Sequence, residues 1–375
     1  MNYTISNALI FRPDCNFHAG NLFIHDEIIS DDSNNDSQII DAQNLYIIPG
    51  LTDIHFHGCK GHDFCEGTQE SLQIIADYEN SIGVANICPA TMTLPEADLT
   101  RIMNNAAKFR ESSPSLTGIN LEGPFISLAK KGAQNPSYII KPDSKMLARL
   151  QNESHNLIKI AVVAPEVEGA FNFITEAKNI AKISVAHTNC DYQTADKAFK
   201  LGASHVTHLY NAMNGINHRE PGPIIAALEN KNVCVELICD GIHIHPAIVR
   251  MTLKLFGDDR VIFISDSMEA TGMSDGNYTL GGQKVIKHGS KALLEDGKTI
   301  AGSVTNLFDC MITAAKFMNV KLESAIKCAA LNPAKAIGLD AGKIESGKFA
   351  DLIALDKDLN LIWVMNHGKF LHSIV

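Results

Sequence analysis

The sequence lacks a cysteine framework. Its nine cysteines are irregularly spaced and no two of them form a Cys-x-x-Cys pair. This argues against a disulfide-stapled secreted domain and against a thiolate zinc site. We therefore expect reduced thiols that pack as small apolar side chains, and we assign Cys59, Cys65 and Cys239 to this class.

The sequence also lacks a long apolar run. The segment VCVELIC is interrupted by Glu236 and is far shorter than the ~20 residues of a membrane-spanning helix. The N-terminus, MNYTISNALIFRPD, has neither a basic segment nor a small-residue cleavage site, so it does not resemble a signal peptide. These absences predict a cytoplasmic protein without a membrane partner.

The sequence has fewer basic than acidic residues. The chain has 32 lysines and arginines against 42 acidic residues, a formal net charge of -10. Such a balance disfavours nucleic acids and anionic membranes as partners. An anionic small molecule is still compatible with it, because one arginine can bind such a molecule locally.

Eight apolar runs of strand length follow one another from residue 51 onward, with helix-like stretches between them. They are LTDIHFH (51–57), VANICPAT (84–91), LTGINLEG (116–123), IKIAVVAP (158–165), ISVAHTN (183–189), SHVTHLYN (204–211), VCVELICDG (233–241) and VIFISDS (261–267). A strand and a helix that alternate eight times predict an α/β fold, a (β/α)8 TIM-like barrel over residues 49–342.

The two ends of the chain have a different texture. Residues 1–48 contain the strand-like runs YTISNALIF, NLFIHDEII and LYII, and residues 343–375 consist of short strands and turns. We expect these two segments to pair into a small β-sandwich domain. Residues 278–302 resemble β-hairpins, and two helices are expected over 304–318 and 322–337.

Ionisable side chains end most of the eight runs. They are, in chain order, His55, His57, Glu122, His187, His208, Asp240, His243 and Asp266. Because barrel strands carry their C-terminal ends to one face, these groups should meet at one rim. A single buried histidine is more often a hydrogen-bonded core residue than a ligand. Several buried together with carboxylates, and without thiolate, instead favour a divalent metal such as Zn, Fe, Mn or Co.

Longer motifs carry a family resemblance. They are PGLTDIHFHG, GINLEGPFIS followed by KKGAQNP, AHTNCDY, GASHVTHLYNAM, HREPG, ELICDGIHIHP, SDSMEATGM, TIAGS and GKFADLIALD. On these motifs the chain resembles, over essentially its whole length, the amidohydrolase superfamily and within it the N-acetylglucosamine-6-phosphate deacetylases. LEGPF, THLYNAM and DGIH together are the specific part, since HxH recurs across the superfamily.

The resemblance implies an activity and a metal site. The activity is metal-dependent hydrolysis of N-acetyl-D-glucosamine 6-phosphate to D-glucosamine 6-phosphate and acetate, in amino-sugar catabolism or recycling. The implied ligands of the main metal are Glu122, His187 and His208, and those of a second metal, bridged by the carboxylate, are His55 and His57. One or two ions per subunit are therefore expected. The implied catalytic residues are Asp266, as base and acid, and His243, which helps to polarise the carbonyl.

The resemblance also implies how the substrate is held. The implied substrate-binding residues are Ala133, Gln134, Asn211, Ala212, His243, Ala301, Gly302 and Ser303. A homodimer is implied too, because Arg219 reaches the phosphate in the neighbouring subunit's site in this family. Without the resemblance, the simpler interpretation of Arg219 is a surface salt bridge with Glu220.

Three alternatives stay open. Gln134 stands where several members have a histidine that touches the sugar, so the 4-epimer, N-acetylgalactosamine 6-phosphate, is a competing substrate. A deaminase or cyclic amidase of the same superfamily would keep HxH and the final aspartate, but it would lack LEGPF as a metal-ligand motif. A barrel that has lost catalysis would act as a binding protein, although no ligand or base position is missing here.

Overall fold

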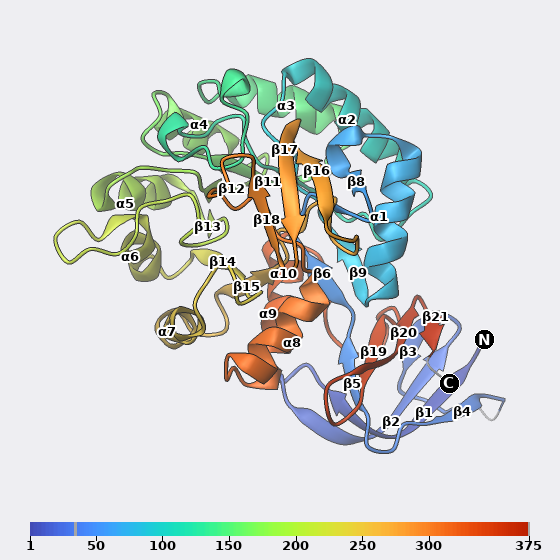
Figure 1. The fold of residues 1–375 in the computed structure, drawn as a ribbon. Coiled ribbons are helices and arrows are strands. Elements are labelled where there is room, and N and C mark those ends of the chain that lie inside the picture. The colour runs from blue at the N-terminus through green and yellow to red at the C-terminus, as the bar shows by residue number, and fades with distance from the viewer. Residues whose placement is uncertain (34–35, 374–375) are drawn as a thin grey trace.

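The computed structural model of the chain describes residues 1–33 and 36–373. A curled set of strands surrounded by helices forms the larger part of the molecule, and a sheet that contains both chain ends lies beside it (Figure 1). The functional candidates at the strand ends all belong to the larger part.

Eight parallel strands form the centre of the larger part. They are β6 (Leu51–Asp53), β9 (Val84–Ile87), β10 (Ile119–Leu121), β11 (Ile158–Val163), β12 (Lys182–Val185), β13 (His205–Val206), β14 (Cys234–Ile238) and β15 (Val261–Ile264). Strands β10 to β15 form one parallel sheet in chain order, and β6 pairs with β9. A parallel bridge between Ile87 and Leu116 joins the two groups. After β15, the Asp266 amide donates to the His55 carbonyl at 2.9 Å. All eight predicted runs contain strands, and their arrangement is consistent with a TIM-like barrel.

The interior below the strand ends is apolar. Ile54, Cys88, Ile160, Ile238 and Ile264 are buried members of one cluster, and they come from five different strands or their ends. Strand β11 is buried almost throughout, as expected where helices and the interior cover both faces of a parallel sheet. Ionisable groups above this apolar layer therefore have little access to water from below.

Helices connect the strands and close the chain. The α-helices are α1 (Gln69–Ser81), α2 (Glu96–Arg110), α3 (Ser144–Glu153), α4 (Ala170–Ala177), α5 (Tyr192–Leu201), α6 (Gly222–Glu229), α7 (Pro246–Phe256), α8 (Leu307–Phe317), α9 (Leu322–Ala329) and α10 (Leu331–Ala336), and the 3-10 helices are η1 (Phe64–Glu66), η2 (Leu128–Lys130) and η3 (Pro136–Tyr138). None of the helices in the described residues is long and apolar enough to span a bilayer.

Helix α3 illustrates why these segments are helical. The Asp143 side chain caps the helix by accepting hydrogen bonds from the backbone amides of Lys145 and Met146. The buried face of α3 consists of Met146, Leu147 and Leu150. The single helix predicted over residues 322–337 is wrong in its length. The structure divides this segment into α9 and α10 at Ala330. Pro333 lacks an amide hydrogen, and its ring conflicts with the carbonyl four residues earlier, so a continuous helix is disfavoured.

The chain ends pair, as predicted. The strands are β1 (Tyr3–Phe11), β2 (Phe17–His25), β3 (Ile28–Ser30), β4 (Gln38–Asp41), β5 (Tyr46–Pro49), β19 (Leu352–Leu355), β20 (Leu361–Asn366) and β21 (Lys369–Ser373). They form one eight-stranded sheet, in which C-terminal β19 runs antiparallel to N-terminal β5. The predicted run NLFIHDEII is two strands, because Asp26 turns the chain with a φ of 55°. The two-layer sandwich is not confirmed by this single sheet.

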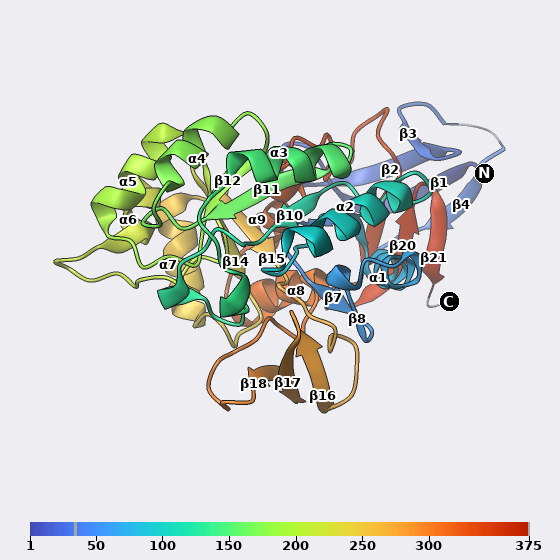
Figure 2. The ribbon, with the colours of Figure 1, turned by 90° about the horizontal axis from the view of Figure 1, so that it is seen from above.

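A small antiparallel sheet projects from the barrel between β15 and α8 (Figure 2). It contains β16 (Gly276–Leu280), β17 (Gln283–His288) and β18 (Lys291–Leu294), and confirms the predicted hairpins. Gly281 and Gly282 join β16 to β17 with φ values of 56° and 78°, which a two-residue hairpin turn of this kind requires. A further short pair is β7 (Gly58–Cys59) and β8 (His62–Asp63).

Candidate active site

The ionisable side chains that end the strands meet at a cavity of about 320 Å³. Its lining residues are His57, Met92, Glu122, Gly132, Ala133, Gln134, His187, His208, Asn211, Ala212, His243, Asp266, Leu280, Lys298, Thr299, Ile300 and Gly302. They come from the carboxyl ends of the strands and from the loop after β18. This is the face of a parallel barrel where active sites form.

Glu122 is the centre of the cluster. Its Oε1 lies 3.0 Å from His208 Nε2, 3.1 Å from His187 Nε2 and 3.3 Å from His55 Nε2. Its Oε2 lies 3.3 Å from His57 Nε2. All five side chains are at most 6% exposed. Four imidazoles from three strand ends therefore converge on one buried carboxylate.

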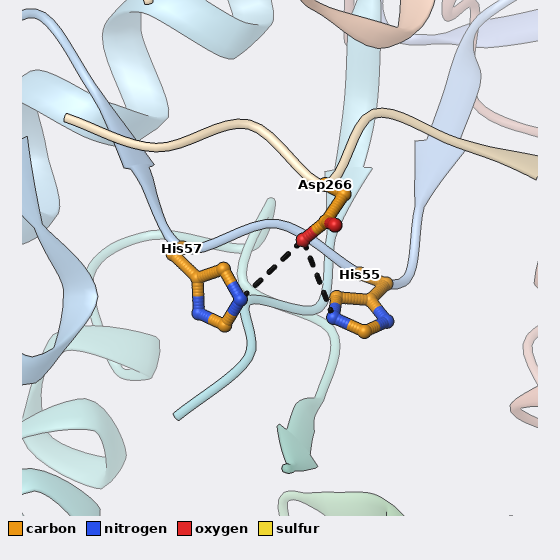
Figure 3. Close-up of side chains that lie close together, drawn as sticks. All are labelled: His55, His57 and Asp266. Atoms are coloured by element: carbon orange, nitrogen blue, oxygen red, sulfur yellow. Dashed lines mark ion pairs between the residues drawn. The ribbon is translucent and has the colours of Figure 1, made fainter. Parts of the chain in front are cut away.

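Asp266 approaches the same imidazoles from the end of β15. Its Oδ1 lies 3.4 Å from His57 Nε2 and 3.6 Å from His55 Nε2 (Figure 3). His55 and His57 lie just after β6, which ends at Asp53, yet their rings turn to the same carboxylate oxygen. The prediction that this pair converges is confirmed, although the strand is shorter than its apolar run.

The outer nitrogens of three of these imidazoles are anchored. The anchors of the Nδ1 atoms are a Glu236 carboxylate oxygen for His55 at 2.9 Å, the Ala90 carbonyl for His57 at 3.3 Å and the Lys130 carbonyl for His187 at 2.9 Å. A carbonyl only accepts, so the imidazole must donate its Nδ1 proton. A neutral ring held in this way turns the lone pair of Nε2 toward the carboxylates.

This arrangement fits a divalent cation. Nε2 atoms and carboxylate oxygens face each other at 3.0–3.6 Å, which is repulsive for neutral imidazoles unless a positive charge lies between the two groups. Two overlapping groups bring their ligand atoms within 4.8 Å of one another: His55, His57 and Asp266, and His55, Glu122 and His208. Nitrogen and oxygen donors with Nδ1 anchored in a second layer are typical of metal sites.

The pKa shifts describe the same demand for positive charge. Burial acts to raise the pKa of Glu122, but the charge of His55 and hydrogen bonds from the imidazoles hold it well below its ordinary value. Burial acts to lower the pKa of His57, but hydrogen bonds to Asp266 and Glu122 raise it to about 10. Protons therefore occupy imidazoles in the metal-free protein, and a divalent cation would displace them.

Three of the site residues have an unusual backbone conformation. His187, His208 and Asp266 have φ values of 44°, 30° and 51°, in the left-handed region that side chains other than glycine rarely adopt. Each conformation turns the chain directly after a barrel strand, so that the side chain enters the cavity. Strain of this kind persists where the surrounding structure fixes it, and it is frequent at functional sites.

Comparison with known proteins identifies the family. The Amidohydrolase family profile matches residues 46–371. The chain belongs to the amidohydrolase family. The N-acetylglucosamine-6-phosphate deacetylase of Bacillus subtilis (strain 168) is 36% identical over 332 residues, which cover 86% of this chain and 84% of the relative. The N-acetylgalactosamine-6-phosphate deacetylase of Escherichia coli O157:H7 is 33% identical over 327 residues, with 85% and 86% covered.

Solved structures agree with this amidohydrolase over its whole length. An Asp-to-Ala mutant of the N-acetyl-D-glucosamine-6-phosphate deacetylase from Mycobacterium smegmatis, in complex with N-acetyl-D-glucosamine-6-phosphate, matches with a TM-score of 0.92 and 30% identity. The match covers 100% of this chain and 99% of that chain. The N-acetylglucosamine-6-phosphate deacetylase from Thermotoga maritima matches with a TM-score of 0.89, 28% identity and 99% coverage of both chains.

His243 of this amidohydrolase lines the cavity and is held by Asp240. The His243 Nδ1 lies 2.7 Å from Asp240 Oδ2, and the His243 backbone amide donates to Asp240 Oδ1 at 2.9 Å. Burial acts to lower the pKa of His243, but the hydrogen bond and charge of Asp240 raise it above its ordinary value. The ring therefore keeps its position, and its Nε2 is the nitrogen left for a ligand.

Gln134 lines the cavity, but both ends of its amide are engaged by the protein. Its Oε1 accepts from the Thr93 backbone amide at 2.7 Å, and its Nε2 donates to Glu122 Oε2 at 2.8 Å. The residue is only 2% exposed. Gln134 therefore holds the central carboxylate, a contact that the sequence comparison with a sugar-touching histidine did not indicate.

The other predicted substrate residues divide into two groups. Asn211 and Ala212 line the cavity, and of the turn 301–303 Gly302 lines it. The Ala301 amide donates to the Ala292 carbonyl and the Ser303 amide to the Asp266 carbonyl. Ala301 and Ser303 are at most 2% exposed, so these two residues support the turn from behind.

Arg219 is exposed and lies outside the cavity lining of its own chain. Its backbone amide donates to Asn217 Oδ1 at 3.0 Å. Within one chain the lining contains no arginine among the described residues, and its only lysine is Lys298, from the loop after β18. A single chain thus offers few cations to an anionic substrate.

Glu236 and Lys298 are two contributors that sequence reasoning missed. Glu236 lies in the middle of the buried strand β14 and bonds His55. A charged residue inside an otherwise apolar strand was the available signal for Glu236. Lys298 gave no comparable signal, since it lies in a polar turn segment.

Proposed function

We propose that this chain is a metal-dependent deacetylase that hydrolyses N-acetyl-D-glucosamine 6-phosphate to D-glucosamine 6-phosphate and acetate. The observation that carries the proposal is the convergence of four imidazoles and two carboxylates on one cavity at the strand ends. The names of relatives at 30–36% identity support the substrate. This chemistry belongs to amino-sugar catabolism or recycling.

The proposed metal ligands fall into two sets. Glu122, His187 and His208 would hold one divalent ion, and His55 and His57, together with Glu122, would hold a second one. Zn, Fe, Mn and Co all accept imidazole and carboxylate ligands. A cation held there polarises an acyl oxygen and lowers the pKa of a bound water from ~15.7 to about 7.

Asp266 and His243 are the proposed catalytic residues. Asp266 takes a proton from the water as its oxygen forms a bond with the acetamide carbon. Asp266 then returns this proton to the nitrogen as the carbon–nitrogen bond breaks, so that the amino sugar leaves as a neutral amine beside acetic acid, which ionises. His243, oriented by Asp240, donates to the oxygen on which negative charge develops.

The proposed substrate contacts surround the metal cluster. Ala133, Gln134, Asn211, Ala212, His243, Ala301, Gly302 and Ser303 form the pocket, directly or by supporting its wall. We propose a homodimer in which Arg219 reaches the phosphate in the neighbouring site, since an arginine fork suits phosphate oxygens. The exposed position of Arg219 outside its own cavity supports this arrangement.

A second substrate is favoured by one observation. Both ends of the Gln134 amide form hydrogen bonds within the protein, to Glu122 and Thr93. A sugar hydroxyl at this position therefore lacks the contact that a histidine makes in several family members. The 4-epimer, N-acetylgalactosamine 6-phosphate, is the corresponding candidate, and a relative from Escherichia coli O157:H7 carries that name.

One assay tests these functions together. Acetate and ammonia release are measured from both 6-phosphate epimers, from unphosphorylated N-acetylglucosamine and from nucleobases, with metal content determined on the same sample. Acetate from a 6-phosphate, with at least one metal ion per chain, is the expected result. Ammonia without acetate would establish a deaminase instead, and full activity of metal-free protein would refute the mechanism.

We also propose the domain and cellular assignments. Residues 1–48 and 343–375 would form a small β-sandwich domain, and residues 49–342 the catalytic barrel. The aromatic rings of Tyr3, in β1, and Phe370, in β21, have centroids 5.4 Å apart. In the strand order of the sheet, β20, β19 and β5 lie between these two strands, so a flat sheet would separate them by four spacings of ~4.8 Å. This contact supports a sheet that folds over itself. The nine free thiols support a cytoplasmic location.

A further inference from the structure

Glu236 is a buried carboxylate below the proposed metal site. It lies in the middle of β14, between Val235 and Leu237, and is 0% exposed. A carboxylate in such a position is costly unless other groups compensate for it. The groups that face it therefore indicate its role.

One oxygen of Glu236 ties two strand ends together. Its Oε2 lies 2.9 Å from His55 Nδ1 and accepts from the His208 backbone amide at 3.0 Å. His55 follows β6, and His208 follows β13. Both residues belong to the group whose ligand atoms lie close enough to share an ion. A single carboxylate oxygen thus holds the ring of one proposed ligand and the backbone of another.

The second oxygen of Glu236 has no hydrogen-bond partner among the described residues. His205 Nε2 lies 3.7 Å from this oxygen, beyond hydrogen-bond distance. The short contacts of this carboxylate therefore all lead toward the metal cluster. Because Oε2 accepts from the His208 amide, it presents an acceptor to its other neighbour, and the matching partner is the Nδ1 proton of His55.

We propose that Glu236 is a positioning residue for the metal site. By accepting the Nδ1 proton it fixes the tautomer of His55, so that Nε2 keeps its lone pair toward the cation. This hydrogen bond also makes Nε2 of the imidazole a stronger electron-pair donor to a metal ion. The inference rests on the proposed function only for the metal itself, and it adds a residue that contacts neither the metal nor the substrate.

Glu79 provides a matched comparison in the same barrel. It is also 0% exposed, but neither of its carboxylate oxygens has a hydrogen-bond partner among the described residues. Glu79 lies in α1, outside the imidazole cluster. A change of Glu79 to glutamine therefore alters a buried carboxylate without altering the support of His55.

The test compares zinc binding by the full-length wild-type protein and the variants Glu236→Gln, Glu236→Leu and Glu79→Gln. Each is stripped with a chelator and titrated with Zn²⁺ against a chromophoric competitor, and thermal unfolding of the metal-free form checks folding. We expect Glu236→Gln to weaken at least one zinc site by about 10-fold and Glu236→Leu by about 100-fold. Glu79→Gln should stay within about twofold of the wild type.

Unchanged zinc affinity and stoichiometry in both folded Glu236 variants would overturn the proposal. If neither variant folds, nitrogen-15 NMR of histidine in zinc-loaded wild-type protein decides. An Nδ1–H, Nε2-bound ring that is lost in His55→Gln supports the proposal, and the opposite tautomer of His55 overturns it. Wild-type protein that binds zinc but releases no acetate would refute the proposed function alone.

Discussion

The two ends of the barrel each carry a cavity, and they differ in how charge is balanced. The cavity at the carboxyl ends of the strands has a volume of about 320 Å³ and holds the imidazole cluster. The other, about 360 Å³, lies where the terminal sheet meets the opposite end of the barrel. It is lined by Pro49, Gly50, Asn86, Arg110, Pro114, Thr117, Leu339, Asp340, Ala341, Gly342, Lys343, Gly347, Lys348, Phe349, Asp351 and His367.

Three of the charged residues in the second cavity pair with one another. Asp340 forms ion pairs with Lys343, at 2.9 Å, and with Lys348, and its side chain is 67% exposed. Hydrogen bonds from these lysines lower the pKa of Asp340 to about 2. At the carboxyl end, by contrast, buried imidazole nitrogens converge on buried carboxylate oxygens without a lysine or arginine partner among the described residues. This contrast favours the smaller cavity as the candidate active site, because clustered buried ionisable groups are a better indicator of function than cavity volume.

Removal of the metal should have the largest effect on this contrast. Stripping the ion should abolish nearly all deacetylase activity, and Zn²⁺ or Mn²⁺ should restore it, because no lysine or arginine among the described residues pairs with the carboxylates of the imidazole cluster. A saturating ion stabilises the folded state by about 3–4 kcal/mol at 100–1,000 times its Kd. Differential scanning calorimetry should show a lower Tm after stripping, and an unchanged Tm would contradict a bound ion.

Asp266→Asn should have the next largest effect. Loss of the proton acceptor should lower kcat by about 10²–10⁴-fold, while metal content per chain stays at the wild-type value. Steady-state acetate release and elemental analysis measure the two quantities. Asp340→Asn, in the second cavity, is the control and should stay within about twofold. Wild-type turnover in Asp266→Asn would remove this residue from the mechanism.

Arg219→Ala tests whether a neighbouring chain completes the site. Loss of a charged hydrogen bond to phosphate should raise KM for the 6-phosphate by about 10–100-fold, with kcat largely retained. Arg110→Ala, which changes an arginine of the second cavity, should leave KM within about twofold. An unchanged KM in Arg219→Ala would leave Lys298 as the lining cation to examine.

Asp240→Asn should produce the smallest effect, a shift in pH dependence. Asp240 raises the pKa of His243 against the opposing effect of burial. A raised pKa keeps His243 protonated to higher pH, so the variant should lose this proton earlier. The alkaline limb of kcat should therefore move to lower pH. Asp275→Asn, beside exposed His288, should move nothing, and an unshifted limb in Asp240→Asn would exclude His243 as the titrating group.

The sequence allowed the fold to be predicted where periodicity was regular. The eight apolar runs each contain one of the eight parallel strands, since a strand that is buried on both faces has a nearly continuous apolar sequence. Periodicity was insufficient for residues 322–337, where Pro333 divides the helix, and for Asp26, where a turn interrupts an apolar run. In both places one residue's backbone constraint outweighs the pattern of its neighbours.

The site was predictable for the residues that end strands, and less so for those that support them. His55, His57 and Glu122 could be found because strand order brings their ends together. The contacts of Gln134 depend on Thr93, 41 residues away, and those of Glu236 on His55, 181 residues away. Such pairings follow from the tertiary arrangement, and no local spacing in the sequence specifies them.

The pairing of β19 with β5 has a consequence for how the chain is made. β5 lies at residues 46–49 and its partner β19 at residues 352–355. During synthesis, the β5 edge that pairs with β19 therefore stays exposed until almost the whole chain has been made. An exposed strand edge is prone to pair with other molecules. The C-terminal strands thus complete the sheet by covering this edge. A chain that stopped before residue 352 would contain the catalytic residues and still lack this closure.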